Sequence, residues 1–372
     1  MPRVRRKRAG LNKMAGEAVK KLDNLGKKIV KDIDEEKNPS MTIPLRTLSN
    51  VVFDRQDKTL KIGDRTFVRS FFNVAHARKF LQTVEVGAIS KDLLNNGKHA
   101  SLRDVFYMAK RTIPNTKINV VDEQQESDSA VEDLEMITGS WREQLNINAN
   151  KLGAVAGNVL VEDAGDLIDW SKLGSGGWSI PSNVEELKFK KVDAKYVIYM
   201  EKAAVWERLN EDKVWKKLNC IIISSQGQAT RGIRRMLQIL STDYKLPIYV
   251  LTDFDPWGIY IYSVLKFGSI NLAHISDRLS VPNARFLGIT ADDIEKYDLK
   301  KHFINFKDVD FSRLEQIGAY DWFKNNKDWQ RQFKMMKDWK AKAEIQALSA
   351  RGISFISDKY LPDKIKNEDW LD

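Results

Sequence analysis

A chain of 372 residues, 42% hydrophobic and 10% aromatic, carries enough apolar material for about two folded domains. No window approaches the roughly 18 uninterrupted apolar residues of a membrane span, and the basic start MPRVRRKRAG lacks the apolar core of a signal peptide. We therefore expect a cytoplasmic protein. The single cysteine, Cys220, excludes an internal disulfide and a thiolate metal site. The net charge of +10 favours a partner rich in phosphates, although a merely basic solvated surface gives the same balance.

Residues 1–40 are predicted to form a basic arm that leads into a polar helix. The arm begins with a cluster of cations, Arg3, Arg5, Arg6, Lys7 and Arg8, and the segment ends in acidic residues. An ordinary disordered terminus explains the same pattern, so the sequence does not decide between the two.

Two strands and two helices are predicted next. The runs VVFDRQ and TLKIGDRTF indicate short strands between Ile43 and Thr66. The segment NVAHARKFLQTVEVGAISKDLLNNG has helical apolar spacing and ends at Gly97, a typical C-terminal cap. Ser101 and Asp104 then have the spacing of a capping box, which predicts that a second helix starts SLRDVFYMAKRTI.

This second helix carries the candidate nucleophile, Tyr107. Its predicted apolar face comprises Leu102, Val105, Phe106, Ala109 and Ile113, and its opposite face comprises Arg103, Tyr107, Lys110 and Arg111. Neighbouring cations would orient a phosphate for attack by the tyrosine hydroxyl. A surface tyrosine on a helix that only contacts DNA through these cations is the simpler alternative, and the pattern alone favours it.

A third helix and a hairpin complete the predicted first domain. The acidic segment SDSAVEDLEMITGSWREQL has helical spacing, and LNINANKLGAVAGNVLV resembles two strands joined by the turn at Asn150–Gly153. Helices followed by a hairpin are typical of a winged helix-turn-helix module, so we expect such a domain over residues 41–160. The Gly-, Ser- and Asp-rich residues 161–190 are predicted to be a linker.

Residues 191–372 have the alternating rhythm of an α/β domain. The apolar runs KYVIYME, CIIISSQG, LPIYVLTDFD and NARFLGI are separated by segments of helical length, which predicts a parallel sheet covered on both faces. Residues that follow parallel strands converge on one edge of the sheet, and here they include Glu201, Asp253 and Asp255. Three carboxylates form an oxygen-only ligand set suited to Mg²⁺. The alternative is that Asp253 and Glu201 cap the helices that follow them.

Several enzyme classes are excluded by missing motifs. The four histidines, His76, His99, His274 and His302, are scattered, so a zinc site is not expected. No GxxxxGK[ST] or G-x-S-x-G sequence occurs, which argues against ATP hydrolysis by this chain and against a serine hydrolase.

Taken together, the motifs resemble the A subunits of topoisomerase VI, the archaeal-type type IIB DNA topoisomerases, and the related meiotic double-strand-break transesterases. The resemblance extends from IPLRTLSNVVFD to ALSARGISFISDKYLPDK; it includes the segments SLRDVFYMAKRT, MEKAAVWERLNEDKVWKKLNC and LTDFDPWGIYIYSVLKFGSINLA. It implies a winged-helix, catabolite-activator-like domain followed by a Toprim domain. It also implies Tyr107 as nucleophile, Arg103 as its neighbouring arginine, and Glu201, Asp253 and Asp255 as carboxylates for Mg²⁺.

The resemblance further implies the reaction and the partners. It indicates cleavage and rejoining of both strands of duplex DNA through a 5′-phosphotyrosyl bond, in an A₂B₂ heterotetramer in which a separate B subunit hydrolyses ATP. It also implies that two copies of this chain pair and that the protein is associated with the nucleoid. Two alternatives remain at this point: a meiotic-type enzyme that breaks DNA without strand passage, and a non-catalytic winged-helix regulator that binds DNA.

Overall fold

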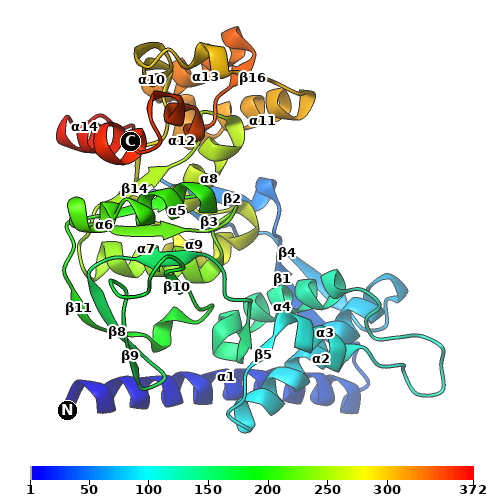
Figure 1. Cartoon of the computed structure of the whole chain (residues 1–372). Helices are drawn as coiled ribbons and strands as arrows, with labels where there is room; N and C mark the ends of the chain where they lie inside the picture. The colour runs from blue at the N-terminus through cyan, green and yellow to red at the C-terminus, as the bar shows by residue number, and fades with distance from the viewer. Residues whose placement is uncertain (1) are drawn as a thin grey trace. The chain divides into compact units, whose positions relative to one another are not determined.

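The computed structural model describes the backbone of residues 2–372 and the side chains from Gly16 onward, and the chain divides into two compact units (Figure 1). The first unit contains the residues up to Val51 and Ile62–Asn150. The second contains Val52–Lys61 and Lys151–Asp372. Within the described part of the chain, every helix is too short or too polar to cross a bilayer.

The first unit is mainly helical. It contains helices α1 (Pro2–Asp34), α2 (Val74–Asn95), α3 (Leu102–Ala109) and α4 (Gln124–Thr138), with strands β1 (Ser40–Pro44), β4 (Thr66–Ser70), β5 (Ala100–Ser101) and β6 (Ile147–Asn148). Strands β1 and β4 pair antiparallel, whereas β5 and β6 pair parallel. The core between α2, α3 and α4 contains fully buried Val86, Val105 and Leu134. The basic arm is not separate from the helix expected after it, because α1 is continuous; the side chains of Arg3 to Arg8 lie outside the described ones.

The helix boundaries around the candidate nucleophile follow the predicted capping signals, with one correction. The side chain of Ser101 accepts a hydrogen bond from the backbone N–H of Asp104, and the Asp104 carboxylate accepts one from Ser101, so the capping box is confirmed. Gly97 follows α2 with a φ of +61°, as a C-terminal cap requires. Helix α3 nevertheless ends at Ala109, so Lys110 and Arg111 lie in the following loop and not on its exposed face.

The predicted hairpin at residues 145–161 is wrong. Strand β6 pairs with β5 in the first unit, whereas β7 (Ala154–Ala156) pairs antiparallel with β13 (Ile221–Ser224) in the second. Gly153 has a φ of +82°, and a Cβ there would lie 2.2 Å from the carbonyl oxygen of Ser224. The glycine that indicates a hairpin turn instead permits close approach of the chain to the main sheet.

The segment expected to be a linker forms β structure. Strands β8 (Val159–Asp163), β9 (Asp166–Asp169) and β11 (Lys188–Val192) make a three-stranded antiparallel sheet, and β10 (Trp178–Ser179) pairs with β7. Trp170 is fully buried and stacks on Trp178. A few large apolar side chains therefore build a small core where the polar and glycine-rich composition predicts only a connection.

The main sheet of the second unit confirms the predicted parallel arrangement at its centre. Its order is β10-β7-β13-β12-β14-β15, where β12 (Val197–Met200), β13, β14 (Ile248–Leu251) and β15 (Arg285–Phe286) run parallel and β7 is antiparallel. Every residue of β12, β13 and β14 is buried, as continuous apolar runs predict. Helices α5 (Ala203–Glu211) and α6 (Val214–Lys217) cover one face, and α7 (Arg231–Thr242) covers the other (Figure 1).

The rest of the second unit packs around this sheet. Its further elements are α8 (Pro256–Phe267), α9 (Ser276–Leu279), α10 (Ala291–Lys296), α11 (Asp308–Gly318), α12 (Asp321–Lys324), α13 (Lys327–Trp339), α14 (Leu361–Lys366), β16 (Ile304–Asn305), β17 (Ala341–Lys342), and the hairpin β2 (Val51–Asp54) and β3 (Thr59–Ile62). Short helical turns include η6 (Ile345–Arg351) and η7 (Ile356–Tyr360). The β2–β3 hairpin joins this unit through Phe53, whose ring contacts Phe267 and Trp322.

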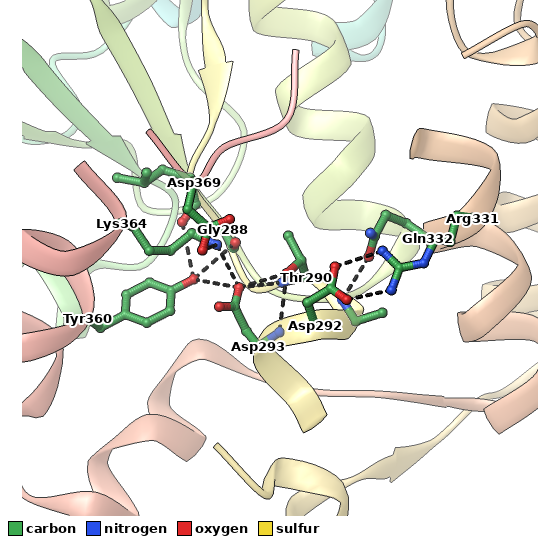
Figure 2. Close-up of polar contacts among 11 residues, drawn as sticks. Gly288, Thr290, Asp292, Asp293, Arg331, Gln332, Tyr360, Lys364 and Asp369 are labelled. Atoms are coloured by element: carbon green, nitrogen blue, oxygen red, sulfur yellow. Dashed lines mark hydrogen bonds and ion pairs between the residues drawn. The ribbon is translucent and has the colours of Figure 1, made fainter. Parts of the chain in front are cut away.

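A buried polar cluster attaches the C-terminal helices to the end of β15 (Figure 2). The Lys364 side chain is 1% exposed, and its Nζ lies 2.8 Å from the carboxylate of Asp293. The same carboxylate accepts a hydrogen bond from Tyr360 and caps α10 together with Thr290. Because this charge pair is fully buried and hydrogen-bonded, loss of either partner alone would leave an uncompensated charge.

Candidate active site

Tyr107 is displayed on the exposed face of α3. Its side chain is 59% exposed, whereas the preceding residue, Phe106, is buried in the core of the first unit. Arg103, one helical turn earlier, donates a hydrogen bond from Nη2 to the Tyr107 hydroxyl oxygen at 3.1 Å. The Arg103 guanidinium carbon also lies 5.0 Å from the centre of the Tyr107 ring. The four-residue spacing on one helix face therefore brings the two predicted site residues together.

The Arg103 side chain has a second anchor, Gln124, which the sequence reasoning missed. Arg103 Nη1 donates to Gln124 Oε1 at 2.7 Å, and Gln124 is the first residue of α4. Arg103 is thus held from two helices, with its guanidinium group beside the tyrosine hydroxyl. No local pattern predicts this contact, because the two residues are 21 positions apart across an irregular loop.

Lys110 and Arg111 lie just beyond the end of α3. Arg111 pairs with the carboxylate of Glu85 on α2 while remaining largely exposed. The Lys110 ammonium lies 5.3 Å from the centre of the Phe106 ring. Both cations are therefore near the tyrosine in the chain, but α3 does not position them.

The three predicted carboxylates lie at one edge of the main sheet. Glu201 directly follows β12, and Asp253 and Asp255 follow the neighbouring parallel strand β14. Burial, and then the charges of Asp253 and Asp255, raise the pKa of Glu201 to about 7. Burial, with a further contribution from Asp253, raises the pKa of Asp255 to about 6. The three groups are therefore close enough to oppose one another's ionisation.

Two of the three carboxylates also have structural partners. Asp253, which is 6% exposed, accepts a hydrogen bond at Oδ1 from the backbone N–H of Ile345 at 2.8 Å. Its Oδ2 lies 2.7 Å from the ammonium of Lys202. Asp255 caps α8 by accepting from the backbone N–H of Gly258. The capping alternative thus applies to Asp255, whereas neither Asp253 nor Glu201 is the N-cap of the helix that follows it.

The donor chemistry of this edge fits Mg²⁺, because three carboxylates from two strand ends supply oxygen ligands and an unrelieved negative charge. Among the residues that the structure describes, however, no group of three His, Cys, Asp or Glu side chains is arranged to hold a metal ion. The reason is visible in the contacts: Lys202 pairs with Asp253, and Asp255 bonds to the start of α8. Lys202 and Glu344, which lie 3.2 Å apart, are the residues of this edge that the sequence reasoning missed.

Comparison with known proteins identifies all three parts of the chain. Residues 78–147 match the model of the type IIB DNA topoisomerase family, and residues 196–365 match the Toprim domain that defines the A subunits of topoisomerase 6 together with Spo11. Residues 149–193 match the all-beta domain of the DNA topoisomerase VI alpha subunit, which agrees with the strands found in place of the expected linker.

Whole-chain relatives give the same result. The chain is 44% identical over 358 residues to the A subunit of type 2 DNA topoisomerase 6 from Pyrococcus abyssi, with 94% of each chain covered. It is 43% identical to the corresponding protein of Pyrococcus horikoshii, again with 94% of each chain covered. For the Hyperthermus butylicus protein the identity is 39%, over 93% of this chain and 94% of the relative. The chain therefore belongs to the family of topoisomerase 6 A subunits, which are type II DNA topoisomerases.

Proposed function

We propose that this chain is the catalytic A subunit of a type IIB topoisomerase, which cleaves and rejoins both strands of duplex DNA through Tyr107. The hydrogen bond from Arg103 to the exposed Tyr107 hydroxyl is the observation that carries this proposal. An exposed hydroxyl beside a guanidinium group is accessible to a DNA backbone phosphate, and the segment that contains both matches the type IIB family model.

The chemistry follows from these two side chains. The Tyr107 oxygen forms a bond to the phosphorus and loses its proton, the bond from phosphorus to the 3′ oxygen breaks, and the 3′ oxygen takes up a proton. Arg103 retains N–H donors beyond those used by Tyr107 and Gln124, so it can bind a non-bridging phosphate oxygen as charge develops. Because a phosphotyrosyl diester replaces a phosphodiester, the 3′ hydroxyl can reverse the step.

Glu201, Asp253 and Asp255 are the residues that would hold Mg²⁺. When bound, this ion supplies positive charge that stabilises the phosphate during transfer. The raised pKa values of Glu201 and Asp255 support this role, since they reflect carboxylates that are packed together with too little compensating charge.

The partners follow from the chemistry and the family. A double-strand break needs two nucleophiles, so we propose that two copies of the chain pair, each with one Tyr107. We assign strand passage to an A₂B₂ assembly with an ATP-hydrolysing B subunit, because the sequence lacks a phosphate-binding loop. The first unit would act as the winged-helix DNA-cleavage domain.

The test is a trapped covalent adduct. The chain, mixed with a topoisomerase VI B subunit, supercoiled plasmid, Mg²⁺ and an ATP analogue and then denatured, should yield linear DNA with protein on its 5′ ends. Tyr107→Phe should yield none while it binds DNA normally, because only one exposed oxygen is lost. Tyr244→Phe, at another exposed tyrosine, is the control and should behave as wild type. Adduct formation by Tyr107→Phe would show that another group attacks.

A further inference from the structure

Lys202 occupies the centre of the carboxylate edge. It directly follows Glu201, and its Nζ contacts Asp253 Oδ2 at 2.7 Å, Glu344 Oε2 at 3.2 Å and Gln346 Oε1 at 2.9 Å. Only 25% of the side chain is exposed. The ammonium group therefore bridges the end of β14 and the turn η6 through three side-chain oxygens.

These contacts are of the kind that a metal ion would otherwise make. Three oxygens, two of them from carboxylates, surround one cationic group at a site where like charges oppose each other. Both oxygens of Asp253 are in use, since Oδ1 accepts from Ile345 and Oδ2 pairs with Lys202. The absence of a preformed three-carboxylate group among the described residues is what this occupation predicts.

A divalent ion and an ammonium group cannot share this position. Mg²⁺ binds carboxylate oxygens at about 2.1 Å, so an ion on Asp253 would lie within a few ångströms of Lys202 Nζ, where two positive charges repel strongly. The four-carbon stem of a lysine is flexible, and the partial exposure of Lys202 gives its ammonium group access to solvent.

We propose that Lys202 is a displaceable internal counter-ion: it neutralises the metal-free carboxylate edge, and Mg²⁺ binds there only when the Lys202 ammonium leaves Asp253. This inference rests on the metal role proposed above for Glu201, Asp253 and Asp255. It adds that metal binding also breaks the links from Lys202 to Glu344 and Gln346, so the state of the metal site is communicated to η6.

The first test is the affinity of the full chain for Mg²⁺, measured by calorimetry at fixed pH and ionic strength. Lys202→Met keeps the apolar stem and removes the competing charge, so it should bind Mg²⁺ roughly tenfold more tightly than wild type. Lys202→Arg keeps the charge and should not bind more tightly. The control, Lys217→Met, removes an exposed lysine that pairs with Asp358 and should leave the affinity unchanged. Equal or weaker binding by folded Lys202→Met would overturn the proposal.

The second test uses the wild-type chain, so it does not depend on the folding of a variant. Amine acetylation followed by mass spectrometry should label Lys202 several-fold faster in Mg²⁺ than in NaCl of the same ionic strength, with Lys217 as the internal reference. Unchanged or slower labelling of Lys202 would contradict displacement. Asp253→Asn separates the two levels of the argument: if it binds Mg²⁺ as wild type does, the metal role itself fails, whereas loss of binding leaves only the lysine role to be judged.

Discussion

The tyrosine site in the first unit and the carboxylate edge in the second are built on opposite electrostatic principles. Tyr107 is exposed, and Arg103 and Gln124 already complete its hydrogen bonds. The carboxylates are largely buried, and their charges oppose one another except where Lys202 compensates. The difference teaches that the nucleophile is positioned by its own unit, whereas the carboxylate edge is complete only with a cation.

Removing one buried charge should have the largest effect on this contrast. Asp253→Asn keeps an oxygen that can accept from the Ile345 N–H but loses the charge that would hold Mg²⁺, so we expect cleavage to fall by roughly 100-fold or more. Asp255→Asn should have a smaller effect, because its oxygen also caps α8. Plasmid cleavage against Mg²⁺ concentration measures both, with Asp358→Asn on the surface as control. Wild-type cleavage by Asp253→Asn would place the metal elsewhere.

Loosening Arg103 should have an intermediate effect on the tyrosine side. Gln124→Leu removes the acceptor of the 2.7 Å hydrogen bond without changing the shape of the side chain greatly. We expect a roughly tenfold loss of adduct formation with unchanged DNA affinity, because Arg103 would no longer be held beside the hydroxyl. Gln125→Leu, at the exposed neighbouring position, is the matched control. If both variants react equally fast, Gln124 does not position Arg103.

The raised pKa of Glu201 predicts a pH-dependent stability in EDTA. An acid whose pKa rises from 4.5 unfolded to about 7 folded binds more protons in the folded state, so its ionisation destabilises the fold as pH increases through this window. Glu201→Gln should therefore match wild type near pH 4.5 and become about 1–2 kcal/mol more stable than wild type by pH 8, after allowance for partial exposure. Urea unfolding at both pH values measures this. A difference that does not grow with pH would contradict the assigned burial.

Single substitutions of the loop cations should have the smallest effect. Lys110→Gln and Arg111→Gln each remove one exposed charge, so each should weaken duplex binding modestly and lower the slope of log affinity against log salt by about one. Titration at several salt concentrations measures this slope. Arg111 should matter less, because it is already paired with Glu85. An unchanged slope for both variants would mean that neither contacts phosphate.

The sequence predicted the elements best where the signal is local. The capping box at Ser101 and Asp104 and the buried parallel strands before Glu201 and Asp253 appear as expected, because caps and continuous apolar runs act over a few residues. The hairpin at 145–161 failed because strand signals do not name a partner, and β7 pairs with a strand more than sixty positions away. The roles of the site residues remain predictions; the structure gives their positions.

The sequence by itself determined which residues lie at the ends of β12 and β14 and which helix face carries Tyr107, since strand order and helical period follow from near neighbours. Only the tertiary structure decided what those residues touch. Arg103 meets Gln124 across 21 positions, and Lys202 meets Gln346 across 144, because packing of separate elements creates these contacts. Hydrogen-bond partners at such separations leave no periodic trace in a single sequence, so folding alone shows that the nucleophile is held by an amide and the carboxylate edge by a lysine.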